Sequence, residues 1–389
     1  MHTGRSVFSQ VLDYLPRHDF QQCVHRYAGD YRLRSFSCLD QFLCMAFAQL
    51  TYRESLRDIE TCLRAVRTKL YHAGLRGRVS RSTLADANES RDWRIWSDLA
   101  HVLIRRARQL YADEPFGVEL DQTAYVMDAT TIDLCLSLFP WAHFRQHKAG
   151  IKLHTLMDLR GNIPCFIRIS DAKTAEVRIL DMLVPEPGAF YIMDRAYTDF
   201  ARLYGLSQHL AFFLIRAKRG LAYTRQKYAR VNHSVGLRCD QTIRLVGPKT
   251  STLYPELLRR ISYYDAETEK RLVFLTNNFV LPALTITQLY RCRWQVELFF
   301  KWVKQYLRIK SFYGTSPNAV KTQVWIAITV YVLAAIIRKE LRLKRSLGEM
   351  LQILSISLFE QMPLDMALTT NCPETSQSDC PNQLPLFDF

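Results

Sequence analysis

Paired cysteines, long apolar runs and an apolar N-terminal segment are all missing from this chain. None of its ten cysteines forms a Cys-x-x-Cys pair, and no Cys and His residues cluster at the spacing of a zinc site. The first 17 residues contain no apolar core of a signal peptide. The longest clean apolar run, 324–337, has 14 residues, too few to cross a bilayer. We therefore expect reduced, mostly buried thiols, no membrane span and a cytoplasmic location.

Basic residues outnumber acidic residues in the chain as a whole. Its 389 residues include 52 Lys and Arg against 37 Asp and Glu, a formal net charge of +15. Residues 286–345 alone hold 12 Lys and Arg against two acids. This distribution indicates a polyanionic partner, which is nucleic acid or, less well supported, an anionic membrane surface. Apolar residues make up 48% of the chain, enough for packed cores, and the length suggests two or three domains.

The stretch 284–307 is the part of the sequence that says most about function. It has no Gly or Pro and is long enough for about six turns of helix. On a helical wheel its polar side chains form one narrow stripe, and apolar residues take the other directions. The stripe consists of Tyr290, Arg293, Glu297, Lys301, Lys304 and Arg308. A buried helix carries such a row where it faces an anionic polymer and a metal site. The alternative is an ordinary amphipathic core helix with surface charges.

The spacing Tyr-x2-Arg-x3-Glu-x6-Lys, formed by Tyr290, Arg293, Glu297 and Lys304, resembles the signature of the insertion-sequence-four family of DDE transposases. The resemblance spans roughly residues 121–345 and, more loosely, the N-terminal part. Asp194, in Met-Asp-Arg-Ala-Tyr, resembles the second acidic motif of that family. Alanines replace the family's usual residues at Ala129, Ala172, Ala175 and Ala196. None of these changes removes an acid, but an alanine that needed a positive φ would be strained.

The segments before and after the aspartates predict a mixed sheet flanked by helices. The order is strand, hairpin, helix, strand, helix, strand, at residues 124–128, 152–170, 174–184, 189–193, 199–206 and 211–215. This order predicts an α+β or mixed α/β protein with a ribonuclease-H-like core. The chemistry of that fold needs two carboxylates on neighbouring strand ends and a third on an adjacent helix. Asp128, Asp194 and Glu297 are therefore the expected catalytic residues and metal ligands, although Asp128 could instead cap a turn.

Residues 1–115 have the pattern of a separate helical unit. Helices are expected at 38–50 and 55–66, followed by a basic turn and a helix that Ser80 or Ser82 caps near Thr83. A helix-turn-helix presents such a segment to DNA, but a plain connection between helices looks the same. The family resemblance implies an N-terminal domain that binds the terminal repeats of the element. The candidates for DNA contact there are Arg76, Arg78 and Arg81.

The remaining chain divides into a catalytic domain at 116–345 and a C-terminal segment at 346–389. The 102 residues between Asp194 and Glu297 exceed what the core needs, so we expect a β-rich insertion at about 220–281, folded out of the core. Its basic residues either follow a DNA backbone or form a solvated face. After a helix at 347–359, the acidic tail has the composition of a disordered chain.

Three carboxylates without Cys or His suit Mg²⁺, and two such ions about 4 Å apart serve both ends of an in-line displacement. Mn²⁺ is expected to substitute. Tyr290, Arg293 and Lys304, with Lys301 and Arg308 on the same stripe, are expected to hold phosphates near the scissile bond. Trp294, beside the stripe, either packs in the core or stacks on an unpaired base.

The resemblance implies a transposase that binds the terminal repeats of its element as double-stranded DNA. It would cut them and join the free 3′-hydroxyls to target DNA in cut-and-paste transposition. The resemblance also implies a homodimer that bridges two ends, and we expect the protein on the nucleoid when it is bound to DNA. Two rivals remain: a nuclease of the same fold that does not join strands, and a non-catalytic DNA-binding protein descended from a transposase.

Overall fold

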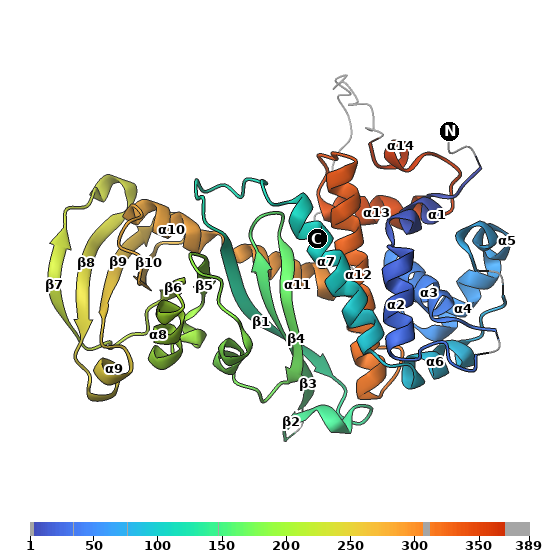
Figure 1. Ribbon diagram of the computed structural model, residues 1–389, viewed down its shortest axis with the longest axis horizontal. Coiled ribbons are helices and arrows are strands. Elements are labelled where there is room, and N and C mark those ends of the chain that lie inside the picture. The colour runs from blue at the N-terminus through green and yellow to red at the C-terminus, as the bar shows by residue number, and fades with distance from the viewer. Residues whose placement is uncertain (1–3, 34, 76, 147, 306–311, 370–389) are drawn as a thin grey trace, which may run out of the picture.

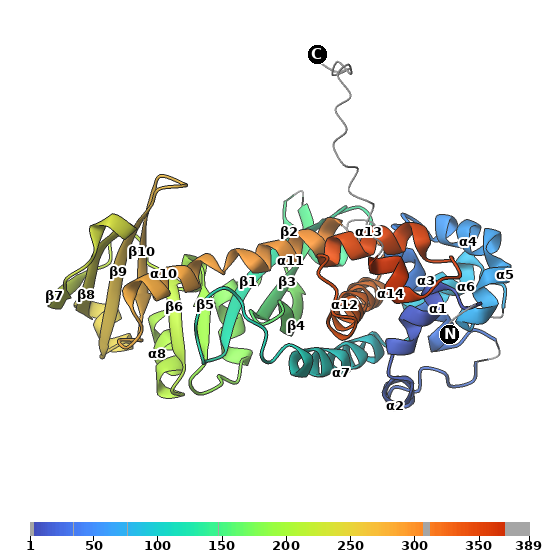
Figure 2. The same ribbon diagram turned by 90° about the horizontal axis from the view of Figure 1, so that it is seen from above.

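The computed structural model describes residues 4–33, 35–75, 77–146, 148–305 and 312–369. The molecule is elongated, with a bundle of helices at one end and a large twisted sheet at the other (Figure 1). Viewed from above, α10 (Ala283–Arg291) and α11 (Trp294–Gln305) run end to end along the sheet toward the helices (Figure 2).

The helical part combines the N-terminal helices with helices from the C-terminal part of the chain. They are α1 (Val7–Val11), α2 (Arg17–Arg26), α3 (Cys38–Leu50), α4 (Leu56–Ala65), α5 (Arg67–Leu70), α6 (Arg81–Ser90), α7 (Arg94–Leu110), α12 (Pro317–Glu340), α13 (Leu347–Ser357) and α14 (Leu364–Thr369). Ser37, Ser55 and Ser80 each accept a backbone N–H at the start of a helix, which confirms the predicted starts of α3 and α4. Because α6 begins at Arg81, the helix expected near Thr83 starts two residues earlier.

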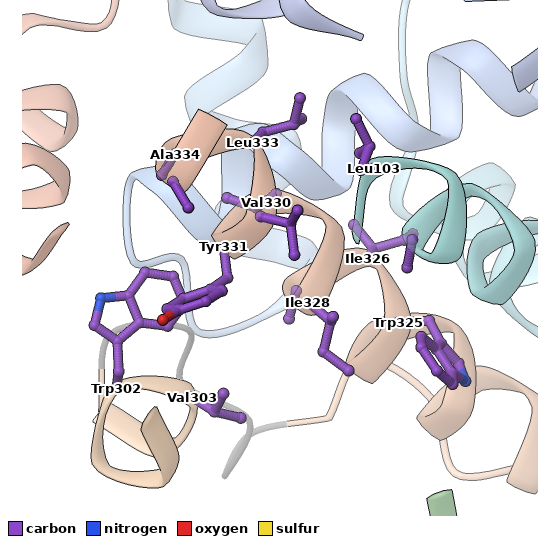
Figure 3. Close-up of a cluster of buried hydrophobic side chains, with 14 of the residues drawn as sticks. Leu103, Trp302, Val303, Trp325, Ile326, Ile328, Val330, Tyr331, Leu333 and Ala334 are labelled. Atoms are coloured by element: carbon purple, nitrogen blue, oxygen red, sulfur yellow. The ribbon is translucent and has the colours of Figure 1, made fainter. Parts of the chain in front are cut away.

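α12 forms the centre of the helical part and packs against α7 and α3. It is long and apolar enough to cross a membrane by length and composition, but 94% of its most apolar window is buried inside the protein. A helix that is apolar all round and covered on all sides is a core helix. Figure 3 shows α12 between α7 and the end of α11, with the rings of Trp302 and Tyr331 edge to face at 4.4 Å.

The sheet near the middle of the molecule has the arrangement of a ribonuclease-H-like fold. Its strands are β1 (Ala124–Leu134), β2 (His143–Arg145), β3 (Lys148–Asp158), β4 (Ile163–Asp171), β5 (Phe190–Met193) and β6 (Phe212–Arg216). β3 pairs antiparallel with β1 and β4, whereas β5 runs parallel to both β1 and β6. The order β4-β3-β1-β5-β6 therefore confirms the predicted fold class. α8 (Phe200–Gln208) covers one face of this sheet, and α11 packs against β1 on the other.

The insertion between Asp194 and Glu297 is rich in strands, as expected, but it does not fold apart from the core. It contains β7 (Tyr223–Ala229), β8 (Leu237–Leu245), α9 (Pro248–Leu253), β9 (Leu257–Asp265) and β10 (Lys270–Thr276). β10 pairs antiparallel with β6, so these strands extend the sheet to ten strands with β7 at its edge. Covering β6 in this way removes an unpaired edge next to the core.

The predicted single helix over 284–307 is wrong, because α10 and α11 are separate helices. At their junction Arg293 N–H donates to Tyr290 O and Gln295 N–H donates to Cys292 O, so the chain is wound more tightly there. The expectation that this region is buried almost all round is also wrong. Trp294 and Leu298 are 51% and 42% exposed, which leaves one side of α11 open to solvent. The end of the predicted helix, from 306 on, lies outside the described residues.

Two further expectations differ from the structure. β1 continues to Leu134, so Asp128 lies inside a strand and not at its end. The helix expected at 174–184 is the shorter 3-10 helix η4 (Glu176–Met182). A long strand fits here because β3 pairs with the whole length of β1.

The packing of α12 can be tested with two identical substitutions. Ile328 is fully buried in α12, whereas Ile356 of α13 is 83% exposed. Ile328→Ala should lower the free energy of unfolding by about 2–5 kcal/mol, because it leaves a cavity in the core. Ile356→Ala should change it by less than about 0.5 kcal/mol. Urea denaturation followed by circular dichroism measures both, and equal losses would contradict the assignment of α12 as the core.

Candidate active site

Asp128 and Asp194 lie next to each other because of the register of two parallel strands. The parallel ladder between β1 and β5 ends with the pair Met127 and Met193. Each aspartate is the residue that follows, and neighbouring strands lie about 4.8 Å apart. Asp194 leaves its strand as the N-cap of η5 (Arg195–Tyr197), whereas Asp128 stays in β1 opposite Thr155. The register therefore brings together the first two predicted acids.

Arg293 joins the third acid, Glu297, to Asp128. Its Nη1 donates to Oδ2 of Asp128 at 3.0 Å, and its Nη2 donates to Oε1 of Glu297 at 2.5 Å. Because Glu297 lies one helical turn after Arg293, a single guanidinium links a carboxylate on β1 with one on α11. The side chains of Asp128 and Arg293 are 18% and 20% exposed, and Glu297 is 56% exposed. The ion pair of Arg293 with Asp128 is thus mostly buried, whereas Glu297 is open to solvent.

Tyr290 connects the same helix region to Asp194. Its hydroxyl donates to Oδ1 of Asp194 at 3.4 Å, and its ring packs against Phe274 of β10. Burial raises the pKa of Tyr290 to about 12, and the charge of Asp194 acts in the same direction. The phenol therefore stays protonated and acts as a donor. Through Tyr290 and Arg293, all three predicted acids contact residues of the predicted stripe.

Burial disfavours the charged form of the Asp128 carboxyl. Burial raises the pKa of its carboxyl to about 6, and the charges of Glu176 and Glu297 add to this. The N–H of Ala129, at 2.8 Å from Oδ1, and the charge of Arg293 lower the pKa. The ionised form of Asp128 therefore depends on a cation beside it.

An open pocket of about 400 Å³ lies between β1 and α11. It is lined by Asp128, Ala129, Thr130, Glu297, Phe300, Lys301 and Lys304. Asp128 of β1 thus lines the same hollow as Glu297, Lys301 and Lys304 of the stripe on α11. Trp294, also on α11, is exposed. An anionic chain that entered this hollow would meet the two lysines close to the two carboxylates.

The donors at this site match a hard divalent cation in chemistry. Carboxylate oxygens are the ligands that Mg²⁺ prefers, and Asp128 and Glu297 already share one cationic group, the guanidinium of Arg293. Within the described part of the chain, no three His, Cys, Asp or Glu side chains are grouped closely enough to hold a metal. Asp128 and Glu297 therefore fit a cation, while the carboxylate of Asp194 accepts the hydroxyl of Tyr290.

The other predicted contact residues do not join this site. Arg78 and Arg81 are exposed around the start of α6, in the helical part and away from β1 (Figure 1). Arg76 and Arg308 lie outside the described residues, as does the acidic tail from 370 on. Of the predicted DNA contacts, Tyr290, Arg293, Trp294, Lys301 and Lys304 are the ones the structure places near the acids.

Sequence reasoning missed a second polar group beside the acids. Nζ of Lys152, on β3, lies 3.4 Å from Oε1 of Glu176 and donates to Thr174 O at 3.0 Å. Tyr197, fully buried in η5, has a hydroxyl without a hydrogen-bond partner among the described residues. Burial raises the pKa of Tyr197, and the charges of Asp128, Glu176 and Asp194 add to that effect. The one signal in the sequence was Lys152, a lysine between the apolar residues Ile151 and Leu153.

Two family models match the chain. Residues 119–333 match the transposase DDE domain, and residues 3–76 match a domain of unknown function, DUF4372. Enzymes with a DDE domain cut and join DNA strands and generally use divalent metal ions. Because the first match covers more than half of the chain, the protein belongs to the DDE transposase family, and the expected resemblance is confirmed.

Named relatives agree with this assignment. The chain is 32% identical over 299 residues to transposase y4zB of Sinorhizobium fredii, which covers 76% of this chain and 81% of the relative. It is 29% identical over 210 residues to a transposase for insertion sequence element IS5377 of Geobacillus stearothermophilus, covering 54% and 55%. A solved synaptic complex of piggyBac transposase with hairpin DNA aligns with 95% of this chain and 86% of that chain, at 10% identity and a TM-score of 0.44, which is a loose likeness.

The isolated hydroxyl of Tyr197 leads to a stability test. Tyr197→Phe removes a buried hydroxyl that has no partner, so stability should stay the same or rise by about 1 kcal/mol. Tyr191, on the adjacent strand β5, is similarly buried but accepts the N–H of Glu186 at 2.9 Å. Tyr191→Phe should therefore lose about 1 kcal/mol. Urea denaturation compares the two, and a greater loss for Tyr197→Phe would show that its hydroxyl is bonded.

Proposed function

We propose that this DDE transposase binds the terminal repeats of its insertion sequence, cuts the DNA there with Mg²⁺, and joins the free 3′-hydroxyls to target DNA in cut-and-paste transposition. The observation that carries the proposal is the convergence of Asp128, Asp194 and Glu297 on the linked side chains of Arg293 and Tyr290. Carboxylates from two parallel strands and a packed helix are the arrangement that metal-assisted phosphodiester chemistry requires.

Asp128, Asp194 and Glu297 are the residues that would hold Mg²⁺, with Mn²⁺ as a substitute. Two bound ions supply Lewis acidity at the attacking and leaving oxygens. The chain itself contributes the positions of the acids: the register of β1 and β5 fixes two of them, and the packing of α11 fixes the third. Burial disfavours the ionised form of Asp128, and a cation bound beside it would stabilise that form.

The cations along α11 fit the role of holding DNA phosphates beside the acids. Lys301 and Lys304 line the same pocket as Asp128 and Glu297. Arg293 has a planar fork that can bind a phosphate bidentately, whereas each lysine acts as a point charge. Arg308, outside the described residues, is proposed as a further phosphate contact. A strand held here would present its scissile phosphate to the carboxylates.

Trp294 fits the role of a stacking surface for an unpaired base. It is 51% exposed at the start of α11, three residues before Glu297. This exposure contradicts core packing, the first of the two roles expected from the sequence. Aromatic faces hold bases that have left the helical stack.

The helical N-terminal part, residues 1–115, is proposed to recognise the terminal repeats, with Arg76, Arg78 and Arg81 as contacts to DNA. The catalytic domain is proposed to span 116–345 with its β-rich insertion at about 220–281, followed by the C-terminal segment 346–389. α12 packs against helices of the N-terminal part and against β4 of the sheet. DNA bound to the helical part would therefore be held in a fixed position relative to the sheet. We place the enzyme in the cytoplasm, on the nucleoid when bound to DNA, and as a homodimer that bridges two ends.

Two assays separate this proposal from its rivals. Cleavage of a labelled duplex that carries the terminal repeat, with and without Mg²⁺, distinguishes an enzyme from a protein that only occupies the ends. Transfer of a precut end into a plasmid distinguishes a transposase from a nuclease that does not join strands. We expect cleavage and strand transfer in Mg²⁺ and neither in EDTA.

Removing one acid should abolish cleavage and spare DNA binding. Asp128→Asn, Asp194→Asn and Glu297→Gln should each lower the cleavage rate by about 100-fold or more, because several kcal/mol of transition-state stabilisation pass through the metal. Asp133→Asn is the matched control, since Asp133 lies exposed on the same strand as Asp128. Gel-shift and cleavage assays on the same duplex measure both properties. Retained cleavage in any of the three variants would remove that residue from the site.

Trp294→Ala should slow cleavage about tenfold, whereas Trp294→Phe should keep most of the rate, because stacking on an aromatic face is worth about 1–3 kcal/mol per base. A duplex with 2-aminopurine at the cleaved end reports the stacking directly through its fluorescence. Equal rates for Trp294→Ala and the unmodified enzyme would show that no base stacks there.

A further inference from the structure

Arg293 is held by two carboxylates. Its guanidinium donates to Asp128 at 3.0 Å and to Glu297 at 2.5 Å, and it lies 6.0 Å from the ring centroid of Tyr290. A cation between two carboxylates offsets the cost of keeping Asp128 ionised in a sheltered place. Arg293 therefore serves as a counter-ion that belongs to the chain itself.

A guanidinium and a divalent cation compete for the same oxygens. Mg²⁺ contacts carboxylate oxygens at about 2.0–2.1 Å and requires near-octahedral space around it. Two positive groups at such short range repel each other strongly in a sheltered site. A metal ion that binds between Asp128 and Glu297 must therefore displace Arg293 from at least one of them.

The position of Arg293 in the chain suits such a displacement. It lies in the two-residue junction between α10 and α11, where the regular helical hydrogen bonding is interrupted. The pocket beside it opens toward Lys301 and Lys304, so an incoming phosphate would arrive next to the guanidinium. Phosphate is the anion that an arginine fork binds bidentately, and it offers Arg293 a new partner.

We propose that Arg293 occupies the metal position until DNA arrives, so that DNA phosphate and divalent metal bind cooperatively. The proposal rests on the proposed role of Asp128 and Glu297 as metal ligands. Linkage makes the coupling reciprocal: DNA strengthens metal binding, and metal strengthens DNA binding by the same factor. The enzyme then holds little metal while it is free of DNA.

The competition between Arg293 and a divalent cation is tested by measuring how tightly the full-length protein binds Mn²⁺ without DNA. Electron paramagnetic resonance measures the Mn²⁺ that stays free. Arg293→Gln should bind Mn²⁺ about tenfold or more tightly than the unmodified protein, the scale expected when a charge-assisted hydrogen-bonded pair no longer competes. Arg293→Lys keeps a charge without the fork and should fall between the two. Arg291→Gln is the control, because Arg291 is two residues away and pairs with Asp265 at 2.7 Å instead.

The coupling is tested by adding a duplex that carries one terminal repeat, already cut and blocked with a 3′-dideoxynucleotide. This DNA should tighten Mn²⁺ binding to the unmodified protein about tenfold and change it less than twofold in Arg293→Gln. Equal affinities in Arg293→Gln and the unmodified protein, with binding lost in Asp128→Asn, would overturn this inference and leave the metal site intact. Mn²⁺ binding to none of the variants, with or without DNA, would overturn both. Thermal unfolding of each variant shows whether it is folded.

Discussion

The ion pairs of Arg293 with Asp128 and Glu297 connect the two elements on which the site depends. β1 supplies one carboxylate and α11 the other, and a single guanidinium holds them together. Without a cation there, burial would favour protonation of Asp128, and two like charges would face each other across the pocket. The pair also fixes the direction in which the row of cations on α11 points. Lys301 and Lys304 lie on the same helix and line the same pocket, so their proposed contacts with DNA depend on this geometry.

The frame behind the site is apolar. The buried side of α11, which includes Val296, Phe299 and Val303, packs toward α12, where the ring of Tyr331 meets Trp302. α12 in turn is surrounded by α7 and α3, so the helical part and the sheet share one packed core. On the other side of the sheet, α8 and the 3-10 helices η4 and η5 form a second core beneath the acids. The charged groups thus lie between two apolar layers, and this arrangement limits how far they can move.

Some of this arrangement could be predicted from the sequence, and the limits have physical causes. Strand patterns and the spacing of Tyr290, Arg293 and Glu297 predicted one site for the three acids, and each acid contacts Arg293 or Tyr290 in the structure. The break before Trp294 was not predictable, because no Gly or Pro marks it and the pull of Asp128 on Arg293 is a tertiary effect. The exposure of Trp294 was missed because a helical wheel shows the direction in which a side chain points. It does not show whether another part of the protein covers that side of the helix. The pairing of β10 with β6 and the contact of Lys152 with Glu176 join segments that no local pattern connects.

The most direct test of the account is a structure of the full chain bound to terminal-repeat DNA in Mn²⁺, with the metal located by its anomalous scattering. The account predicts Mn²⁺ bound by oxygens of Asp128, Asp194 and Glu297, with the guanidinium of Arg293 moved onto a DNA phosphate. Metal bound elsewhere, or Arg293 still bridging Asp128 and Glu297 with DNA seated in the pocket, would contradict it.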